Sequence, residues 1–90
     1  MQESIKDYIV TPHAAIEMRH RAIDEAIVAQ VLANPEQRLQ TRTGRDVLQS
    51  RIDFAGRIFL VRVFVDVDRS PPEVVTAYRT SKIEKYWRNP

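Results

Sequence analysis

The feature that most constrains the fold is a long run of strict alternation in the second half of the chain. Within residues 57–67 every second side chain is apolar, namely Phe59, Val61, Val63, Val65 and Val67. A period of two places successive side chains on opposite faces of a β-strand. The run therefore predicts a sheet with one apolar face that a second layer must bury. The other face of this strand is mixed, because it carries Ile58, Leu60, Arg62, Phe64 and Asp66.

Further strands are expected on both sides of this run. Residues 47–54 also alternate, and Ala55-Gly56 predicts a tight turn between the two strands. Residues 73–79 form a last strand after the break at residues 68–72, and residues 36–41 form a weaker first strand before a turn at residues 43–45. Short connections join strands that run in opposite directions. We therefore expect an antiparallel sheet of three or four strands.

The period changes to that of a helix before Pro35. Thr11 is a good N-cap and Pro12 suits the first helical position, so a helix is expected to run to Arg21. Asp24 is expected to cap a second helix, which Pro35 ends. The apolar stripes of the two helices consist of Ala14, Ala15 and Met18, and of Ile27, Val28, Val31 and Leu32.

A short helix is expected at the C-terminal end. Residues 81–84 read Ser-Lys-Ile-Glu, the pattern of a capping box with Ser81 as the N-cap, and the helix would carry Tyr86 and Trp87. Residues 1–90 therefore predict a single α+β domain. Its two N-terminal helices pack on one face of a three- to four-stranded antiparallel sheet, and a short helix follows the last strand.

Composition excludes several kinds of chemistry. The chain has no cysteine, which rules out disulfides, thiolate nucleophiles and cysteine-bound zinc. No apolar run approaches the roughly 20 residues of a membrane span, and residues 1–10 contain Glu3, Lys6 and Asp7 where a signal peptide would be apolar. We therefore expect a cytoplasmic protein with no membrane partner.

Charge is distributed unevenly along the chain. Residues 1–37 carry three Lys or Arg and six Asp or Glu, a net charge of −3, whereas residues 38–90 carry eleven and six, a net charge of +5. A basic segment favours an anionic ligand such as RNA. The strands and the C-terminal helix are therefore the expected place for a ligand.

Local motifs for nucleotides and metals are missing. The chain contains no GxxxxGK[ST], GxGxxG, HExxH or GxSxG, and its two glycines are too few for a phosphate-cradling loop. His13 and His20 lie about two turns apart on one helix, roughly 10 Å at a rise of 1.5 Å per residue, so they cannot share an ion. No metal ion or other cofactor is expected.

The end of the last strand is unusually dense in polar groups. Tyr78, Arg79, Thr80 and Ser81 follow one another directly, and Lys82 comes next. RNA cleavage without a metal needs a base for the 2′-hydroxyl, cations at the phosphorus and an acid for the 5′-oxygen. A phenol, a guanidinium and hydroxyls can serve these roles. Ser81 already has a structural explanation as the N-cap.

Each remaining candidate also has two interpretations. His13 is either a general base, since the start of a helix favours neutral imidazole, or a surface residue with a local hydrogen bond. Arg62 on a sheet face either pairs with Asp53 or Asp66 or binds phosphate, and for Arg51 phosphate recognition is favoured. Tyr86 and Trp87 either stack on bases or complete the core.

Two stretches of the chain carry a resemblance to a known family. The first stretch is Thr11-Pro12-His13-Ala14 with Glu17-Met18-Arg19-His20-Arg21. The second is Thr76-Ala77-Tyr78-Arg79-Thr80-Ser81-Lys82-Ile83-Glu84-Lys85-Tyr86-Trp87. Between them stand Ile23, Val28, Val31-Leu32 and Asn34-Pro35. The chain resembles the DUF4258 family of small bacterial domains. That family is commonly grouped with the barnase, EndoU, colicin and RelE-like ribonucleases, which include toxin modules and pair N-terminal helices with an antiparallel sheet.

The resemblance implies particular site residues. The family's helix-borne histidine and arginine match His13 and Arg19 or Arg21, and its C-terminal motif matches Thr76, Tyr78, Arg79 and Ser81. One departure is Ala22, where the family usually has glycine, so the connection between the helices is where a difference in shape is expected.

These observations lead to one hypothesis and two rivals. The hypothesis is a metal-independent, RelE-like ribonuclease or toxin-like domain acting on RNA, with catalytic residues His13, Tyr78 and Arg79. The expected substrate-binding residues are Arg19, Arg21, Arg51, Thr80 and Lys82. One rival is a non-catalytic module of a toxin–antitoxin or mobile-element locus that binds nucleic acid or a protein such as an antitoxin. The other is a homodimer formed through Ile58, Leu60 and Phe64.

Overall fold

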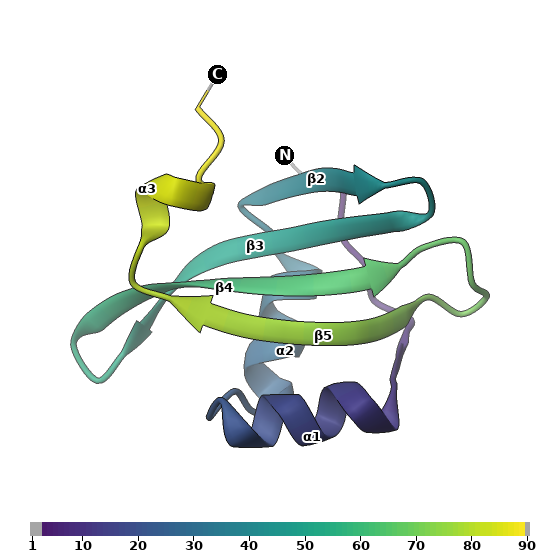
Figure 1. The fold of residues 1–90 in the computed structure, drawn as a ribbon, viewed down its shortest axis with the longest axis horizontal. Coiled ribbons are helices and arrows are strands. Elements are labelled where there is room, and N and C mark those ends of the chain that lie inside the picture. Colours follow the sequence, from purple (N-terminus) through teal and green to yellow (C-terminus); the bar gives the residue numbers. More distant parts are fainter. Residues whose placement is uncertain (1–2, 90) are drawn as a thin grey trace.

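The computed structural model describes residues 3–89 and forms an α+β domain with a five-stranded sheet (Figure 1). The strand order in the sheet is β1-β5-β4-β3-β2. In chain order the elements are β1 (Ile9–Val10), α1 (Pro12–His20), α2 (Glu25–Ala33), β2 (Gln37–Arg42), β3 (Arg45–Phe54), β4 (Arg57–Asp66), β5 (Glu73–Thr80) and α3 (Ile83–Tyr86).

The sheet is mixed, and the expectation of a purely antiparallel sheet of three or four strands is wrong. β2 to β5 are antiparallel as predicted, but β1 is a fifth strand that pairs parallel with β5, with Ile9 opposite Glu73 and Val10 opposite Val74. Two residues are too few to show an alternation. Their pairing also joins segments that are far apart in sequence, so no local pattern indicates it.

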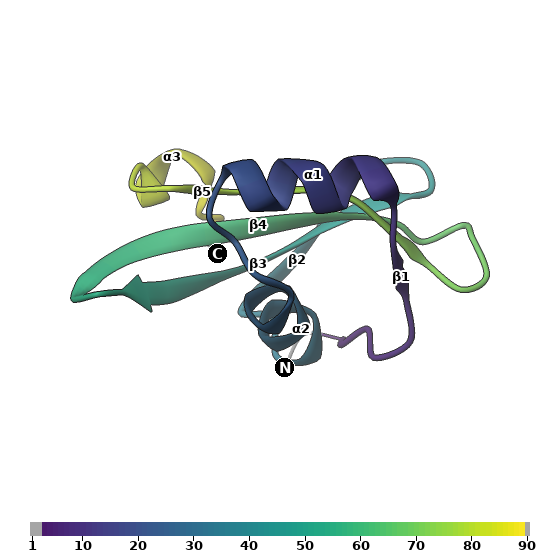
Figure 2. The ribbon, with the colours of Figure 1, turned by 90° about the horizontal axis from the view of Figure 1, so that it is seen from below.

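The alternating run predicted the centre of the sheet correctly. β4 lies between β3 and β5, and Val61, Val63 and Val65 are fully buried in the core. α2 packs on this side of the sheet through its buried stripe of Val28, Val31 and Leu32. α3 lies on the other side (Figure 2). The two faces are called the α2 face and the α3 face below.

α1 is placed differently from α2, although both helices contribute to one core. It runs along the β5 edge of the sheet (Figures 1 and 2), and its Ala14 and Met18 are buried in the same cluster as the α2 stripe. The expectation that both helices pack on one face is therefore correct for α2 and incomplete for α1. Glu17 of α1 reaches the rim of the sheet, where it contacts Thr76 of β5.

Two of the three predicted caps are confirmed. Thr11 Oγ1 accepts a hydrogen bond from the Ala14 N–H at 3.1 Å, and Asp24 Oδ1 accepts one from the Ile27 N–H at 2.9 Å. The capping box at Ser81 is wrong. The N-cap of α3 is Lys82, which makes no side-chain cap bond. Thr80 Oγ1 instead accepts from the Lys82 N–H at 3.0 Å and so makes the turn out of β5. No helix within residues 3–89 has the length and apolar character that crossing a membrane requires.

Candidate functional site

Three polar side chains form a row across the middle of the α3 face. The strand register places Gln49 of β3 opposite Arg62 of β4, and Arg62 opposite Tyr78 of β5. Side chains that share a register position point to the same face. Three residues that are distant in sequence are therefore brought together.

Arg62 lies at the centre of this row, in a cage of aromatic rings. Its Nε donates to Gln49 Oε1 at 2.8 Å and its Nη1 donates to Tyr78 Oη at 2.7 Å. The guanidinium carbon is 4.4 Å from the centre of the Tyr86 ring, 5.3 Å from that of Phe64 and 5.7 Å from that of Tyr78. These positions fit cation–π attraction. The side chain is half-buried, so one side of the cage faces solvent.

Neither aspartate considered as a structural partner of Arg62 pairs with it. Asp66 binds Arg45 with a 2.6 Å contact from Nε, and Asp53 Oδ1 accepts from the Gly56 N–H at 2.7 Å. Within residues 3–89, no ion pair joins Arg62 to a carboxylate. The ion-pair interpretation of Arg62 is therefore wrong. Its positive charge is balanced only by aromatic faces and neutral oxygens.

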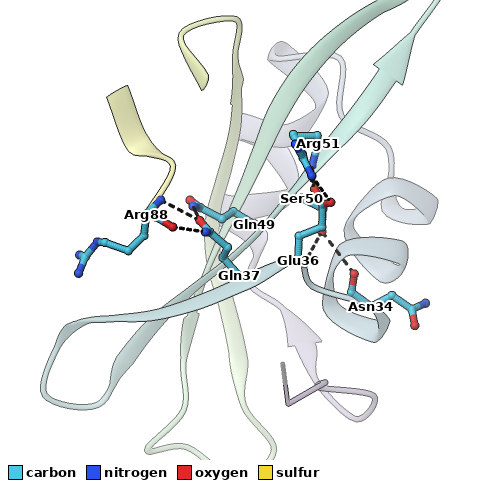
Figure 3. A network of polar contacts seen from close by, with 7 residues as sticks. All are labelled: Asn34, Glu36, Gln37, Gln49, Ser50, Arg51 and Arg88. Atoms are coloured by element: carbon cyan, nitrogen blue, oxygen red, sulfur yellow. Dashed lines mark hydrogen bonds and ion pairs between the residues drawn. The ribbon is translucent and has the colours of Figure 1, made fainter. Parts of the chain in front are cut away.

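Gln49 fixes both Arg62 and the C-terminal segment. This side chain is fully buried, and its Nε2 donates to Gln37 Oε1 at 2.7 Å and to the Tyr86 carbonyl at 3.1 Å. Gln37 continues the network, because its Oε1 accepts from the Arg88 N–H at 3.0 Å and its Nε2 donates to the Arg88 carbonyl (Figure 3). Buried polar groups with all partners present are rigid. The two glutamines thus hold Tyr86 above Arg62.

Tyr86 is a phenol of the cage whose acidity is altered by its neighbours. A hydrogen bond from Tyr78, followed by the charges of Lys85 and Arg62, lowers the pKa of Tyr86 below its ordinary value of 10.0. The Lys85 ammonium lies 5.3 Å from the Tyr86 ring centre. Positive neighbours stabilise the phenolate form of the side chain. The cage therefore combines a fixed guanidinium with a phenol that loses its proton more readily than free tyrosine.

Arg51 lies on the same face but is already paired. Its Nε and Nη2 donate to the two Glu36 carboxylate oxygens at 3.0 and 2.8 Å, and its backbone N–H also donates to Glu36 at 2.7 Å (Figure 3). These bonds lower the pKa of Glu36 and raise that of Arg51. The guanidinium stacks 4.3 Å from the Trp87 ring centre. Arg51 is thus a stacked, neutralised side chain rather than a free cation.

A separate network lies where α1 meets the β5 edge. Thr76 Oγ1 donates to Glu17 Oε1 at 2.6 Å, and Arg21 Nη1 donates to Thr76 Oγ1 at 3.1 Å and to the Ala77 carbonyl at 2.9 Å. The Thr76 bond, aided by the charges of Arg21 and His13, lowers the pKa of Glu17. His13 Nε2 lies 3.4 Å from Glu17 Oε1, and the imidazole is 76% exposed. Arg21 and Glu17 therefore join α1 to β5.

Tyr78 and Arg79 point to opposite faces of the sheet. Arg79 is opposite Val61 in the register and so lies on the α2 face, where its guanidinium carbon is 4.4 Å from the Phe54 ring centre and 5.0 Å from that of Phe59. His13 is at the β5 edge, and Arg51 is beside α3. His13, Arg51 and Arg79 would have to share one cleft to act on one phosphate, and they lie apart. The period of two already separates Tyr78 from Arg79.

The remaining expected binding residues are dispersed. Arg19 lines a cavity between α1 and α2, Lys82 is exposed at the start of α3, and Thr80 is engaged by its bond to the Lys82 N–H. Of the apolar residues expected at a dimer interface, Leu60 is fully buried and Ile58 is 47% exposed. Phe64, the third, stacks on Tyr78 with ring centres 5.9 Å apart.

Gln49, Gln37 and Tyr86 are site residues that the sequence did not single out for this role. Gln49 had no distinctive local signal, because its face of β3 also carries Arg45, Arg51 and Asp53. Its partners could not be read from the sequence, because they depend on the register of three strands and on the return of the chain after β5. No cluster of three or more His, Asp or Glu side chains that could hold a metal ion occurs within residues 3–89.

Comparison with known proteins identifies the family. The family model named "Domain of unknown function (DUF4258)" matches residues 10–79, which is more than half of the chain. The match begins at Val10, the second residue of β1, and ends at Arg79 within β5, before α3. Neither the curated proteins nor the solved structures contain a match to this chain. The sequence resemblance is thereby confirmed at the level of the family, and the chain belongs to the DUF4258 family.

Proposed function

We propose that this domain binds single-stranded RNA on its α3 face and cleaves it without a metal ion, as a RelE-like ribonuclease or toxin-like module. The observation that carries the proposal is the caged guanidinium of Arg62. It has two fixed hydrogen bonds, no carboxylate partner within residues 3–89 and three aromatic rings around it. A half-buried cation without a counter-ion favours an anionic ligand.

The surroundings of Arg62 fit a phosphodiester better than a small anion. Within the described chain, Nη2 of Arg62 makes no hydrogen bond and can donate to a phosphate oxygen. Bases of a single strand stack on aromatic rings, and Tyr78, Tyr86 and Phe64 present such rings beside the cation. Lys85 adds a second positive charge at the rim.

The same groups supply the chemistry of transesterification. Tyr86, as phenolate, takes the proton of the 2′-hydroxyl, whose oxygen attacks the adjacent phosphorus. Arg62 stabilises the charge on the phosphorane. The bond from phosphorus to the 5′-oxygen breaks, and that oxygen takes the proton of Tyr78. The products are a 2′,3′-cyclic phosphate and a 5′-hydroxyl, and proton transfer from Tyr86 to Tyr78 restores the starting state.

This assignment moves two roles away from the residues expected from sequence. The base is Tyr86 rather than His13, because His13 is engaged with Glu17 at the β5 edge. The phosphate-binding cation is Arg62 rather than Arg79, because Arg79 stacks on Phe54 on the α2 face. Tyr78 keeps its expected role as acid or proton relay.

The decisive experiment measures cleavage of end-labelled single-stranded RNA and of ribosome-bound mRNA by the purified protein in the presence of EDTA. We expect Arg62→Gln and Tyr86→Phe each to lower the rate by about 100-fold or more, in the range typical of a lost general base or charge stabiliser. Arg57→Gln, which removes an equal charge at the tip of the β3–β4 hairpin, should retain the wild-type rate. The predicted products are cyclic phosphates.

Two results would contradict the proposed site. One is wild-type cleavage by the Arg62→Gln protein. The other is a loss of cleavage in Arg79→Gln as large as that in Arg62→Gln, which would return the chemistry to the α2 face.

Binding without turnover is a second candidate, and one observation favours it. Both histidines lie on α1, and among residues 3–89 neither they nor a carboxylate bonds to Arg62. A non-catalytic module would bind the same labelled RNA with an affinity that depends on Arg62 and salt, and would leave the strand intact. A protein partner such as an antitoxin would instead compete with RNA for the α3 face.

A further inference from the structure

A groove beside α3 is not used by the proposed cleavage centre. It has a volume of about 620 Å³ and is lined by Arg51, Ile83, Glu84, Trp87 and Asn89. This volume is within the range of about 300–1,000 Å³ that is usual for small-molecule sites. The lining combines an indole, a guanidinium, a carboxylate and an amide. Flat and polar groups of this kind suit a planar heterocycle.

One wall of the groove is a preformed stacking surface. Arg51 lies 4.3 Å from the Trp87 ring centre, and Glu36 holds its guanidinium in place by a bidentate ion pair. That ion pair balances the charge of Arg51, so the side chain offers little to a phosphate. A fixed guanidinium plane and an indole are surfaces on which an unstacked base can lie.

The groove is one step along the sheet from Arg62. Arg51 and Gln49 are two residues apart on β3 and point to the same face, a spacing of roughly 7 Å at about 3.4 Å per residue. Trp87 likewise follows Tyr86 directly. A nucleotide whose phosphate binds Arg62 can therefore place its own base in this groove.

We infer that this groove binds a guanine base. This inference rests on the proposed RNA ligand and states which base of that RNA the domain selects. Glu84 supplies the selective group, since it is the only carboxylate in the lining and makes no ion pair within residues 3–89. A carboxylate accepts two parallel hydrogen bonds. Guanine presents two adjacent donors, N1–H and the N2 amino group. Adenine, cytosine and uracil each place an acceptor beside their donor, which a carboxylate repels.

Trp87 is the only tryptophan of the chain, so all of the tryptophan fluorescence comes from the wall of this groove. Titration with 5′-GMP is expected to quench it saturably and at least about five-fold more tightly than 5′-AMP, 5′-CMP or 5′-UMP, because a good bidentate pair discriminates by about 1–3 kcal/mol. Glu84→Gln should abolish the preference for GMP while stacking on Trp87 persists. Glu25→Gln, an exposed carboxylate on α2, is the matched control, and N-acetyltryptophanamide corrects for absorption and collisional quenching.

The outcomes separate this inference from the proposed function. Equal quenching by all four nucleotides, no saturable quenching, or a GMP preference that survives Glu84→Gln would each overturn the guanine site. Binding of labelled RNA, measured by anisotropy, tests the proposed function independently. RNA binding that requires Arg62 but leaves Trp87 unquenched refutes the guanine site alone. GMP-selective quenching without any binding of longer RNA refutes the proposed function and supports the guanine site.

Discussion

At the scale of single residues, neighbours decide what each polar side chain can do. Arg62, Arg51 and Arg79 are all strand arginines with aromatic neighbours, yet only Arg51 among them is neutralised by a carboxylate. Arg62 is the one held by a buried amide and a phenol. The same residue type therefore serves as a stacking surface at Arg51 and as a candidate phosphate ligand at Arg62.

Tyrosine ionisation tests the electrostatics of the cage. The pKa of Tyr86 is lowered, chiefly by the hydrogen bond from Tyr78, whereas burial raises the pKa of Tyr8. Tyr86 should thus ionise before Tyr8 in a phenolate absorbance titration. Tyr86→Phe should remove the early step, Tyr78→Phe should move that step toward pH 10, and Tyr8→Phe should remove a later step.

The lowered pKa of Tyr86 also determines how the free energy of unfolding changes with pH. The folded protein releases the Tyr86 proton at a lower pH than the unfolded chain does. Its contribution to the free energy of unfolding is therefore fully present above the ordinary pKa of 10.0 and is lost as the pH falls through the lowered folded pKa. A first titration step that is unchanged in Tyr86→Phe would contradict this picture.

At the scale of elements, the connection between α1 and α2 depends on one alanine in an unusual conformation. Ala22 has a φ of 55°, in the left-handed region that glycine adopts without steric cost. Alanine at this position therefore costs energy at the helix end, while the backbone has the conformation that suits glycine.

Ala22→Gly should therefore stabilise the protein. We expect the free energy of unfolding to rise by about 0.5–1 kcal/mol, measured by chemical denaturation. Ala29→Gly, in the exposed interior of α2, provides the comparison and should lower it by about 1 kcal/mol, since glycine is unfavourable within a helix. Destabilisation by both substitutions would show that Ala22 is not strained.

The position of α3 depends on Gln49 more than on the helix itself. α3 has four residues and no side-chain cap, so it is not stable alone. Gln49→Met keeps the volume of the side chain but leaves Arg62 Nε, Gln37 and the Tyr86 carbonyl without their partner. We expect a loss of about 1–3 kcal/mol in the free energy of unfolding, together with a red shift of Trp87 fluorescence as the C-terminal segment loosens.

The matched control for Gln49 is Gln40→Met, on the exposed part of β2. It should change neither stability nor fluorescence. An unshifted Trp87 spectrum in Gln49→Met would mean that α3 is held by other contacts.

At the scale of the whole molecule, the two faces of the sheet have different roles. One face is buried in the core, and the other carries the candidate ligand site. α2 and the buried stripe of α1 cover the α2 face, whereas in the described part of the chain the short helix α3 covers part of the other face. Residues 38–90, which carry the net charge of +5, form β3 to β5, α3 and nearly all of β2. The core and the candidate ligand surface are thus two sides of one basic sheet.

Salt dependence measures how many of these charges contact RNA. The logarithm of the affinity for single-stranded RNA should fall with the logarithm of salt concentration, with a slope of about −0.7 for each phosphate contact. Arg62→Gln should make the slope less steep by about 0.7, and Arg57→Gln should leave it unchanged. Equal effects of the two substitutions would indicate diffuse attraction to the basic sheet instead of a contact at Arg62.

The sequence by itself determined the elements whose signals are local. The caps at Thr11 and Asp24, the turn at Ala55-Gly56 and the alternation of β4 depend on residues within a few positions of one another, and all were predicted correctly. Family membership also follows from the sequence, since the motifs that carry it are linear. The false capping box at Ser81 shows the limit, because the hydroxyl of Thr80 makes a competing local bond.

Only the tertiary structure decided the site. β1 joins the sheet through a parallel pairing with β5, and Gln49, Arg62 and Tyr78 meet through the register of three strands. Tyr86 reaches them because the chain turns back after β5 and is held there by Gln37 and Gln49. Tyr78 and Arg79 are neighbours in sequence, but the pleat of the strand sends them to opposite faces. Residues that are far apart in sequence meet in a sheet through strand register, which is why the sequence did not assemble the cage around Arg62.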